Sequence, residues 1–248
     1  MDTLELGLAG KVAIVTGGSE GLGLACVERF ARSGAKVAAC ARRKDVLERG
    51  VEQVRRATGG DILAMTADVT KGAEVEAFVK ATLARFGGVD ILVNNAGTSS
   101  AAGFDQVDEQ HGPGAEPVVV GPHAVDADRR RALIHAPADD LVARVRGGAA
   151  RLHDDPRVNR EETAPAHRAG RVHLQDCLGL VKSAQHERRA KGDVEEYYKE
   201  ISERRKLPLG RFGEASEFAD LVAFLASERA AYITGTAVNF DGGISAAV

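Results

Sequence analysis

The first hundred residues alternate between short apolar runs and longer amphipathic stretches, with glycines at the junctions. Short β-rich runs bounded by glycine predict strands, and apolar residues that recur every three to four positions predict helices. The predicted strands occupy 11–18, 35–41, 61–69 and 89–97. One helical stretch ends at 28–34, and two further helical stretches occupy 45–60 and 73–88. This order predicts an α/β fold with a Rossmann-like, doubly wound parallel sheet.

The last seventy residues show the same regular patterning. Residues 193–206 are amphipathic, and a helix is predicted from about Ala215 to Ala226 because Phe218, Leu221, Val222 and Leu225 repeat at helical spacing. A final strand is predicted over 236–243.

Residues 110–176 break this pattern. These 67 residues contain six of the seven histidines, six of the seven prolines and ten arginines, but no serine, tyrosine, lysine, phenylalanine or methionine. Short strands are candidates at 116–122 and, as a sixth strand, at 172–177, but no convincing fifth strand is present. We therefore predict one domain over 1–248 that is poorly formed around the fifth strand and the fourth and fifth helices.

Length and charge narrow the class of protein. A chain of 248 residues with 44% hydrophobic content suits one α/β domain with a full core. Its formal net charge of −3 gives no basic surface for nucleic acid or a membrane. The sequence also shows no signal-peptide pattern and no apolar membrane span, so a cytoplasmic protein is expected. Cys26, Cys40 and Cys177 lie in apolar runs and are expected to be reduced core thiols.

A glycine-rich turn joins the first predicted strand to the first helix. The sequence TGGSEGLG places Gly17, Gly21 and Gly23 at this junction. Glycines there permit a tight turn and let a pyrophosphate approach the helix N-terminus. By itself the pattern is also compatible with an ordinary glycine-rich βα loop.

Two further motifs extend this pattern, and together the three resemble the classical short-chain dehydrogenase/reductase family. They are Asp68 and Val69 after the third strand and NNAG, residues 94–97, after the fourth. The resemblance implies that Asp68 contacts the adenine amine, that Val69 faces the ring and that Asn95, Ala96 and Gly97 line the ribose side. It also implies that the cofactor lies against Gly17, Ser19, Glu20, Gly21, Leu22 and Gly23.

The end of the second strand indicates which cofactor is bound. NAD-binding relatives carry an acidic residue here that accepts hydrogen bonds from the ribose hydroxyls, but this chain reads CARRK. Arg42, with Arg43 beside it, can pair with a 2′-phosphate, which favours NADP(H) over NAD(H). The alternative is that both arginines are ordinary solvated surface charges.

Residues 177–183, CLGLVKS, resemble the family's loop after the sixth strand. The resemblance implies that the backbone near Val181 meets the nicotinamide carboxamide and that the Ser183 hydroxyl reaches the phosphates. Leu178 stands where the family has a proline, and leucine does not fix φ. Residues 184–206 would form the variable substrate lid.

The family's catalytic centre is absent from this sequence. Relatives use a serine and a Tyr-x-x-x-Lys to position the carbonyl and to move the proton. Residues 110–176 contain none of these residue types, and no Tyr-x-x-x-Lys occurs anywhere in the chain. No catalytic residue is therefore assigned. The histidines lack close ligand spacing such as His-x-x-x-His, so no metal site is predicted either.

One hypothesis accounts for the composition of 110–176: the segment is translated out of frame from a GC-rich gene. The residue types that vanish there are largely those with AT-rich codons. The gene would then encode an NADP(H)-dependent oxidoreductase that interconverts an alcohol and a ketone, while the chain as written is inactive. The alternative is a non-catalytic dinucleotide-binding or regulatory protein of the same fold. The resemblance also implies a homo-oligomer, and relatives assemble through the fourth and fifth helices, which fall within the segment of this chain that departs from the family.

Overall fold

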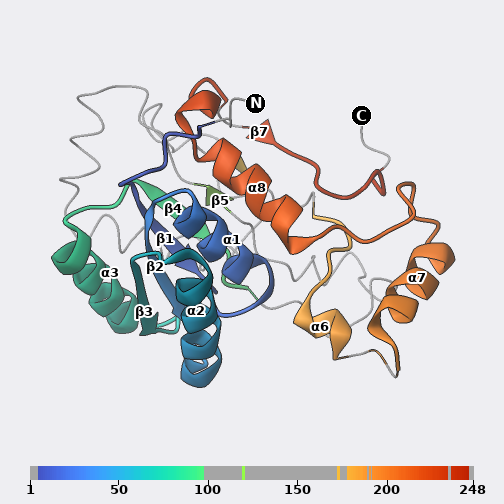
Figure 1. Cartoon of the computed structure of the whole chain (residues 1–248), viewed down its shortest axis with the longest axis horizontal. Helices are drawn as coiled ribbons and strands as arrows, with labels where there is room; N and C mark the ends of the chain where they lie inside the picture. The colour runs from blue at the N-terminus through green and yellow to red at the C-terminus, as the bar shows by residue number, and fades with distance from the viewer. Residues whose placement is uncertain are drawn as a thin grey trace, which may run out of the picture.

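The computed structural model describes residues 5–97, 119–120, 172–173, 178–188, 190, 192–233 and 236–245. In these parts of the chain the strands form one seven-stranded sheet with the order β3-β2-β1-β4-β5-β6-β7, in a single Rossmann-like domain (Figure 1). The strands are β1 Val12–Thr16, β2 Lys36–Ala41, β3 Ile62–Thr66, β4 Ile91–Asn94, β5 Val119–Val120, β6 Val172–His173 and β7 Thr236–Ala237.

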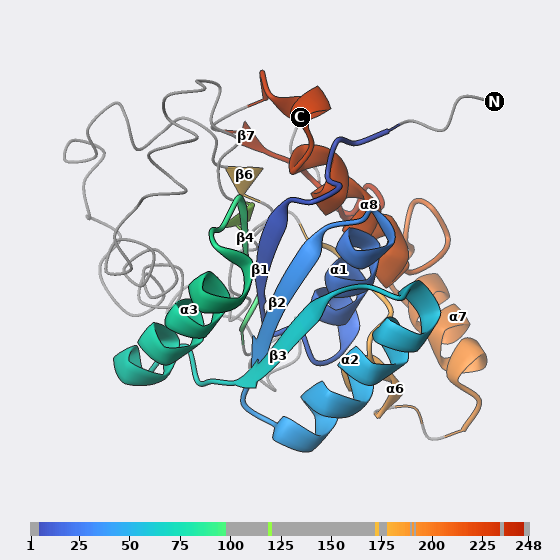
Figure 2. The ribbon, with the colours of Figure 1, turned by 60° about the vertical axis from the view of Figure 1, so that its left-hand side comes forward.

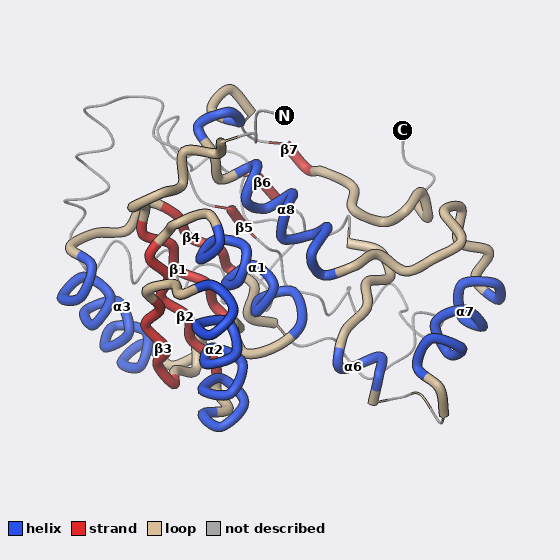
Figure 3. The backbone as a smooth tube through the Cα atoms, viewed as in Figure 1, coloured by secondary structure: helices blue, strands red, loops and turns tan. Residues whose placement is uncertain are grey.

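Six α-helices and one short 3₁₀ helix accompany these strands in the described residues. They are α1 Gly21–Arg32, α2 Lys44–Thr58, α3 Gly72–Phe86, α6 Ala184–Glu187, α7 Val194–Arg204, α8 Ala215–Leu225 and η3 Glu228–Ala230. Helices α6 and α7 lie at the opposite end of the molecule from α3 (Figure 3). None of the described helices combines the length and the apolar content needed to cross a membrane.

The sheet is parallel from β1 to β4, as the alternating sequence predicts. Strand β1 pairs in parallel with β2 on one side and with β4 on the other, and β2 pairs in parallel with β3. Strand β5 departs from the prediction, because it pairs antiparallel with both β4 and β6. It falls within the candidate strand 116–122, whereas β6 falls within 172–177. The final strand β7 is shorter than the predicted 236–243.

Both faces of the central strands are buried, in keeping with the continuous apolar runs of a parallel sheet. Ala13 and Val15 belong to a core cluster shared with α1, α2 and α8. Val12 and Ile14, which alternate with them, belong to a second cluster shared with α3. Figure 2 shows α3 on one side of the strands and α1 with α2 on the other.

The two cysteines in the described residues occupy different layers of this core. Cys26 on α1 packs in the first cluster, and Cys40 on β2 packs in the second. Both thiols are fully buried, and burial raises the pKa of each to about 12. The prediction of core thiols is confirmed for these two residues, whereas Cys177 lies outside the described residues.

Helix α8 covers α1 and begins with a reciprocal capping box. The Glu214 N–H donates to the Glu217 carboxylate at 2.8 Å, and the Glu214 side chain accepts from a backbone N–H of the first turn. Arg211 also forms a two-pronged ion pair with Glu217, with distances of 2.7 and 2.8 Å. These hydrogen bonds, with that from Arg211 the largest, lower the pKa of Glu217 to about 2.

Glu217 should therefore make the start of α8 sensitive to acid. Its pKa is about 2 in the folded chain against an ordinary value of 4.5, so its stabilising contribution is complete above pH 4.5 and is lost as the pH falls toward 2. Because the side chain is 43% exposed, we expect Glu217→Gln to cost less than about 1 kcal/mol at pH 6. Urea unfolding of both proteins from pH 6 to pH 2.5 tests this. The two stabilities should converge as the pH falls, and a constant difference would contradict the assignment.

Candidate functional site

The carboxyl ends of β1, β2, β3 and β4 meet at one edge of the sheet, because these four strands are parallel (Figure 2). Gly17 follows β1, Arg42 follows β2 and Asn95 follows β4 directly. Residues far apart in the sequence are thereby gathered at one edge, which is where ligands bind in open α/β sheets.

The Thr16 hydroxyl connects the ends of β1 and β4. It accepts hydrogen bonds from the backbone N–H groups of Asn95 and Ala96, each at 3.0 Å. The Asn95 side-chain amide returns toward the glycine turn and donates to the carbonyl oxygens of Thr16 at 3.0 Å and Gly17 at 3.2 Å. Thr16 is 2% exposed. This buried network fixes the glycine turn against the end of β4.

The glycine turn has no room for side chains where it touches α1. A Cβ added at Gly23 would lie 2.2 Å from the Gly17 carbonyl oxygen and 2.4 Å from the Asn95 amide nitrogen. Gly21 instead faces open space, with φ +58°, and a Cβ there would meet no atom within 4 Å. No side chain caps the N-terminus of α1. The turn therefore leaves a clear approach for a phosphate group to the first N–H groups of the helix.

Glu20 lies in the same turn and pairs with two arginines. Its carboxylate accepts a hydrogen bond from Arg43, which lies just before α2. The other carboxylate oxygen lies 3.5 Å from the Arg188 guanidinium, at the end of α6. The carboxylate thus connects the glycine turn to the segment predicted as the substrate lid.

Arg42 and Asp68 stand at the ends of β2 and β3, on the side of the edge where the adenosine half is expected. Asp68 Oδ1 accepts hydrogen bonds from the backbone N–H of Thr70 at 3.0 Å and from its hydroxyl at 2.7 Å. These bonds lower the pKa of Asp68, and the charge of Arg42 lowers it further. Arg42 is exposed, whereas Asp68 and Val69 are half-buried. The arrangement offers a cation beside an aspartate that stays ionised.

The loop 178–183 passes beside the C-terminal segment. Gly179 N–H donates to the Phe240 carbonyl at 2.9 Å, and Val181 forms a bridge with Gly213. The Ser183 hydroxyl caps α6 by accepting the His186 N–H at 3.4 Å. A hydroxyl that accepts one hydrogen bond keeps its own proton as a donor, so Ser183 retains the capacity to bind an anion.

Lys182 and Tyr198 lie close together but lack the properties of an acid pair. The Lys182 ammonium is 5.3 Å from the centre of the Tyr198 ring and pairs with Glu195 and Glu214, each at 3.0 Å. Burial raises the pKa of Tyr198, and its hydroxyl donates to the Ser183 carbonyl. A catalytic tyrosine requires the opposite shift of its pKa. This pair therefore holds α7 against the loop.

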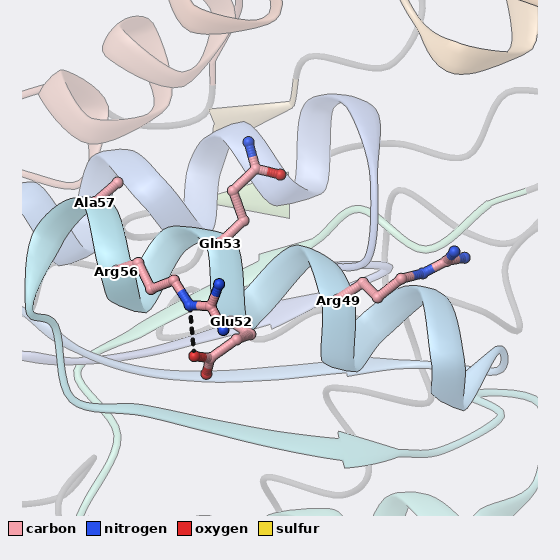
Figure 4. Close-up of a pocket in the computed structure, with 5 residues that line it drawn as sticks. All are labelled: Arg49, Glu52, Gln53, Arg56 and Ala57. Carbon is pink, nitrogen blue, oxygen red and sulfur yellow. Dashed lines mark hydrogen bonds and ion pairs between the residues drawn. The ribbon is translucent and has the colours of Figure 1, made fainter.

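A shallow depression lies elsewhere, on the exposed face of α2 (Figure 4). Arg49, Glu52, Gln53, Arg56 and Ala57 line it, and Arg56 donates to Glu52 at 3.0 Å. It contains none of the residues gathered at the sheet edge, so it does not belong to the candidate site.

The structure places the predicted residues of the glycine turn, Arg42 and Arg43, Asp68 and Val69, and Asn95 to Gly97 near the carboxyl ends of β1 to β4. Val181 and Ser183 lie in the loop before α6, and Arg188 after α6 pairs with Glu20 of the glycine turn. Three features were missed: the Thr16 hydroxyl, the Glu20 ion pairs and Arg188. The only sequence signal for Thr16 is its position at the end of an apolar run. No sequence feature near Arg188 identifies it as a site residue. The segment in which the catalytic serine, tyrosine and lysine are predicted to be missing lies almost entirely outside the described residues. Most of the histidines considered as metal ligands lie outside them too.

Comparison with protein families gives two separate matches. A sequence model described as short chain dehydrogenase matches residues 11–112, and one described as enoyl-(acyl carrier protein) reductase matches residues 177–245. The glycine turn, Arg42, Asp68 and Asn95 lie in the first match, and Val181 and Ser183 lie in the second.

Individual relatives match along nearly the whole chain. An uncharacterized oxidoreductase of Mycobacterium bovis is 32% identical, with 95% of this chain and 97% of the relative covered. A 3-oxoacyl-[acyl-carrier-protein] reductase of Staphylococcus epidermidis is 30% identical, with 94% and 98% covered. An NADPH-bound short chain oxidoreductase of Pseudomonas aeruginosa PAO1 is described as containing an atypical catalytic center. It is 28% identical with a TM-score of 0.70, and the match covers 97% of this chain and 99% of that one.

The Thr16 network yields a prediction about stability. Thr16→Val keeps the shape of the side chain but removes the acceptor for two partly buried N–H groups, which should cost about 1–3 kcal/mol. Thr16→Ser keeps the hydroxyl and should cost less, about 1 kcal/mol for the lost methyl group. Urea unfolding of the three proteins measures both effects. A valine variant as stable as wild type would show that the hydroxyl does not hold β1 to β4.

Proposed function

This chain belongs to the classical short-chain dehydrogenase/reductase family, and from that premise we propose that its gene encodes an NADP(H)-dependent oxidoreductase interconverting an alcohol and a ketone. The family consists of oxidoreductases that act on small molecules with NAD(P)(H). The finer proposal is supported by two relatives, one bound to NADPH and one described as a 3-oxoacyl reductase.

The observation that carries the proposal is the combination of an open glycine turn with Arg42 at the end of β2. The turn fits a pyrophosphate, because Gly21 faces open space and no side chain caps α1. Arg42 fits a 2′-phosphate, because it stands where an NAD-specific site would place a carboxylate. A nicotinamide cofactor bound here would supply the hydride.

The remaining residues are proposed to orient that cofactor. Asp68 and Val69 hold the adenine, and Asn95, Ala96 and Gly97 line the ribose side. The Val181 backbone meets the carboxamide, and the Ser183 hydroxyl donates to a phosphate. Gly17, Ser19, Leu22 and Gly23 form the wall of the turn, with Arg43 beside Arg42.

Catalysis by this exact chain is not part of the proposal. Hydride transfer to a ketone leaves an alkoxide that needs a positioned acid, and the Tyr-x-x-x-Lys that supplies it in relatives does not occur in this sequence. We propose that residues 110–176 of the single domain 1–248 are read out of frame and that the correct frame supplies the acid. The missing acid equally favours the alternative, a non-catalytic nucleotide-binding protein. The two hypotheses differ in whether the gene encodes the catalytic residues in another frame.

The cofactor assignment predicts that NADPH binds more tightly than NADH through Arg42. Loss of a charge-assisted hydrogen bond costs about 1.5–3 kcal/mol, and the exposure of Arg42 places the effect at the lower end, near tenfold in dissociation constant. Calorimetric titration of wild type and Arg42→Ala with both cofactors measures it. Arg49→Ala, an exposed arginine on the far face of α2, is the matched control and should change neither affinity. Equal NADPH affinity of wild type and Arg42→Ala would reject the assignment.

The reading-frame proposal predicts activity only after correction. The other two frames across codons 110–176 should reveal a serine followed by Tyr-x-x-x-Lys, and the protein made from that frame should reduce ketones with NADPH. Because general acid-base catalysis contributes about 10²- to 10⁴-fold, the chain as written should show no measurable turnover. Absence of the pattern from both frames, or ordinary turnover by the present chain, would overturn the proposal.

A further inference from the structure

The Glu20 carboxylate holds two arginines that reach the glycine turn from different parts of the chain. Arg43 precedes α2 and donates to one carboxylate oxygen. Arg188 follows α6, and its guanidinium lies 3.5 Å from the other oxygen. One acidic side chain thus pairs with two cations beside the proposed phosphate site.

The Glu20 carboxylate does not cap α1, although Glu20 stands directly before that helix. It is the N-cap residue, where an acidic side chain commonly accepts the first N–H groups of a helix. Its backbone is extended, with φ −158° and ψ 170°, and its side chain makes no capping hydrogen bond. Asp193, by contrast, caps α7 by accepting the Glu196 N–H at 2.9 Å. The Glu20 carboxylate is directed at the arginines, and the helix N-terminus is left to another anion.

Both ion pairs are open to exchange with a stronger anion. The side chains of Arg43 and Arg188 are 53% and 57% exposed, and that of Glu20 is 33% exposed. Exposed pairs between single charges are weak. A phosphate carries up to twice the charge of a carboxylate and offers three acceptor oxygens to a guanidinium fork. Phosphate and Glu20 are therefore alternative partners for the same two arginines.

We propose that Glu20 competes with the phosphate groups of NADP(H) for Arg43 and Arg188, and that Arg188 is a phosphate ligand contributed by the segment after α6. The inference rests on the proposed function, since it assumes that the cofactor binds at the glycine turn. Glu20 thereby lowers the affinity for the cofactor and links its binding to the position of α6.

The first test is Glu20→Gln in the full 248-residue chain, with cofactor binding measured by calorimetry. Removing one competing charge should lower the NADPH dissociation constant roughly two- to fivefold, with less effect on NADH, which lacks the 2′-phosphate. The gain should shrink as salt screens the competing charges. Glu28→Gln is the matched control, because Glu28 pairs with Arg32 further along the same helix. This control should leave both constants unchanged.

The second test separates a phosphate ligand from a merely structural partner of Glu20. Arg188→Gln should weaken NADPH binding more in the Glu20→Gln background than in wild type, because there Arg188 serves only the phosphate. Adenosine 2′,5′-bisphosphate, titrated in parallel, reports the phosphate contacts without the nicotinamide. If Arg188→Gln changes nothing in the Glu20→Gln background, Arg188 is only an ion-pair partner.

The outcomes distinguish this inference from the proposed function. A wild-type chain with thermal unfolding and circular dichroism typical of a folded protein, but with no NADPH binding, would reject the function and the inference together. NADPH binding that Glu20→Gln leaves unchanged or weakens, with folding intact, would reject the inference alone. In that case Glu20 would instead hold Arg43 in place for the cofactor.

Discussion

The parallel pairing of β1 with β2 on one side and β4 on the other determines where everything else in the site can stand. Parallel strands deliver their carboxyl ends to the same edge, so each βα turn opens at the same place. The pairing also requires both faces to be covered, which is why α1, α2 and α8 share one core cluster and α3 shares the other. The Thr16 hydroxyl then fixes the turn after β1 to the end of β4.

Elements set by local patterning were predictable from the sequence. Strands β1 to β4 and helices α2, α3, α7 and α8 have strong periodicity within fifteen residues, and they lie close to their predicted bounds. Arg42 could be placed at the end of β2 by counting along one strand. Antiparallel β5 could not be predicted, because two paired residues leave no readable alternation. The pairing of Glu20 with Arg188 spans 168 positions, and no local signal connects the two residues.

The residues proposed to bind the nucleotide lie outside the stretch where relatives carry their catalytic residues. The glycine turn, Arg42, Asp68 and Asn95 all come from the first 97 residues, and the hydrogen bonds of Asp68 with Thr70 and of Asn95 with Thr16 are made within that stretch. Damage confined to 110–176 would therefore remove the proton donor while leaving the cradle for the phosphates in place. A non-catalytic nucleotide-binding protein would keep the same residues of the first 97 positions. The gene sequence over 110–176 therefore distinguishes the two hypotheses, whereas cofactor binding is expected from both.

The two buried cysteines can report how often the core around each of them opens. Burial raises the pKa of both thiols and keeps them from solvent, so a reagent reaches them only when the surrounding layer opens. Cys26 packs in the cluster that α1 shares with β1 and α8, whereas Cys40 packs in the cluster shared with α3 on the other side of the sheet. The rates at which an alkylating reagent modifies the two positions therefore report separately how often each layer of the sandwich comes apart.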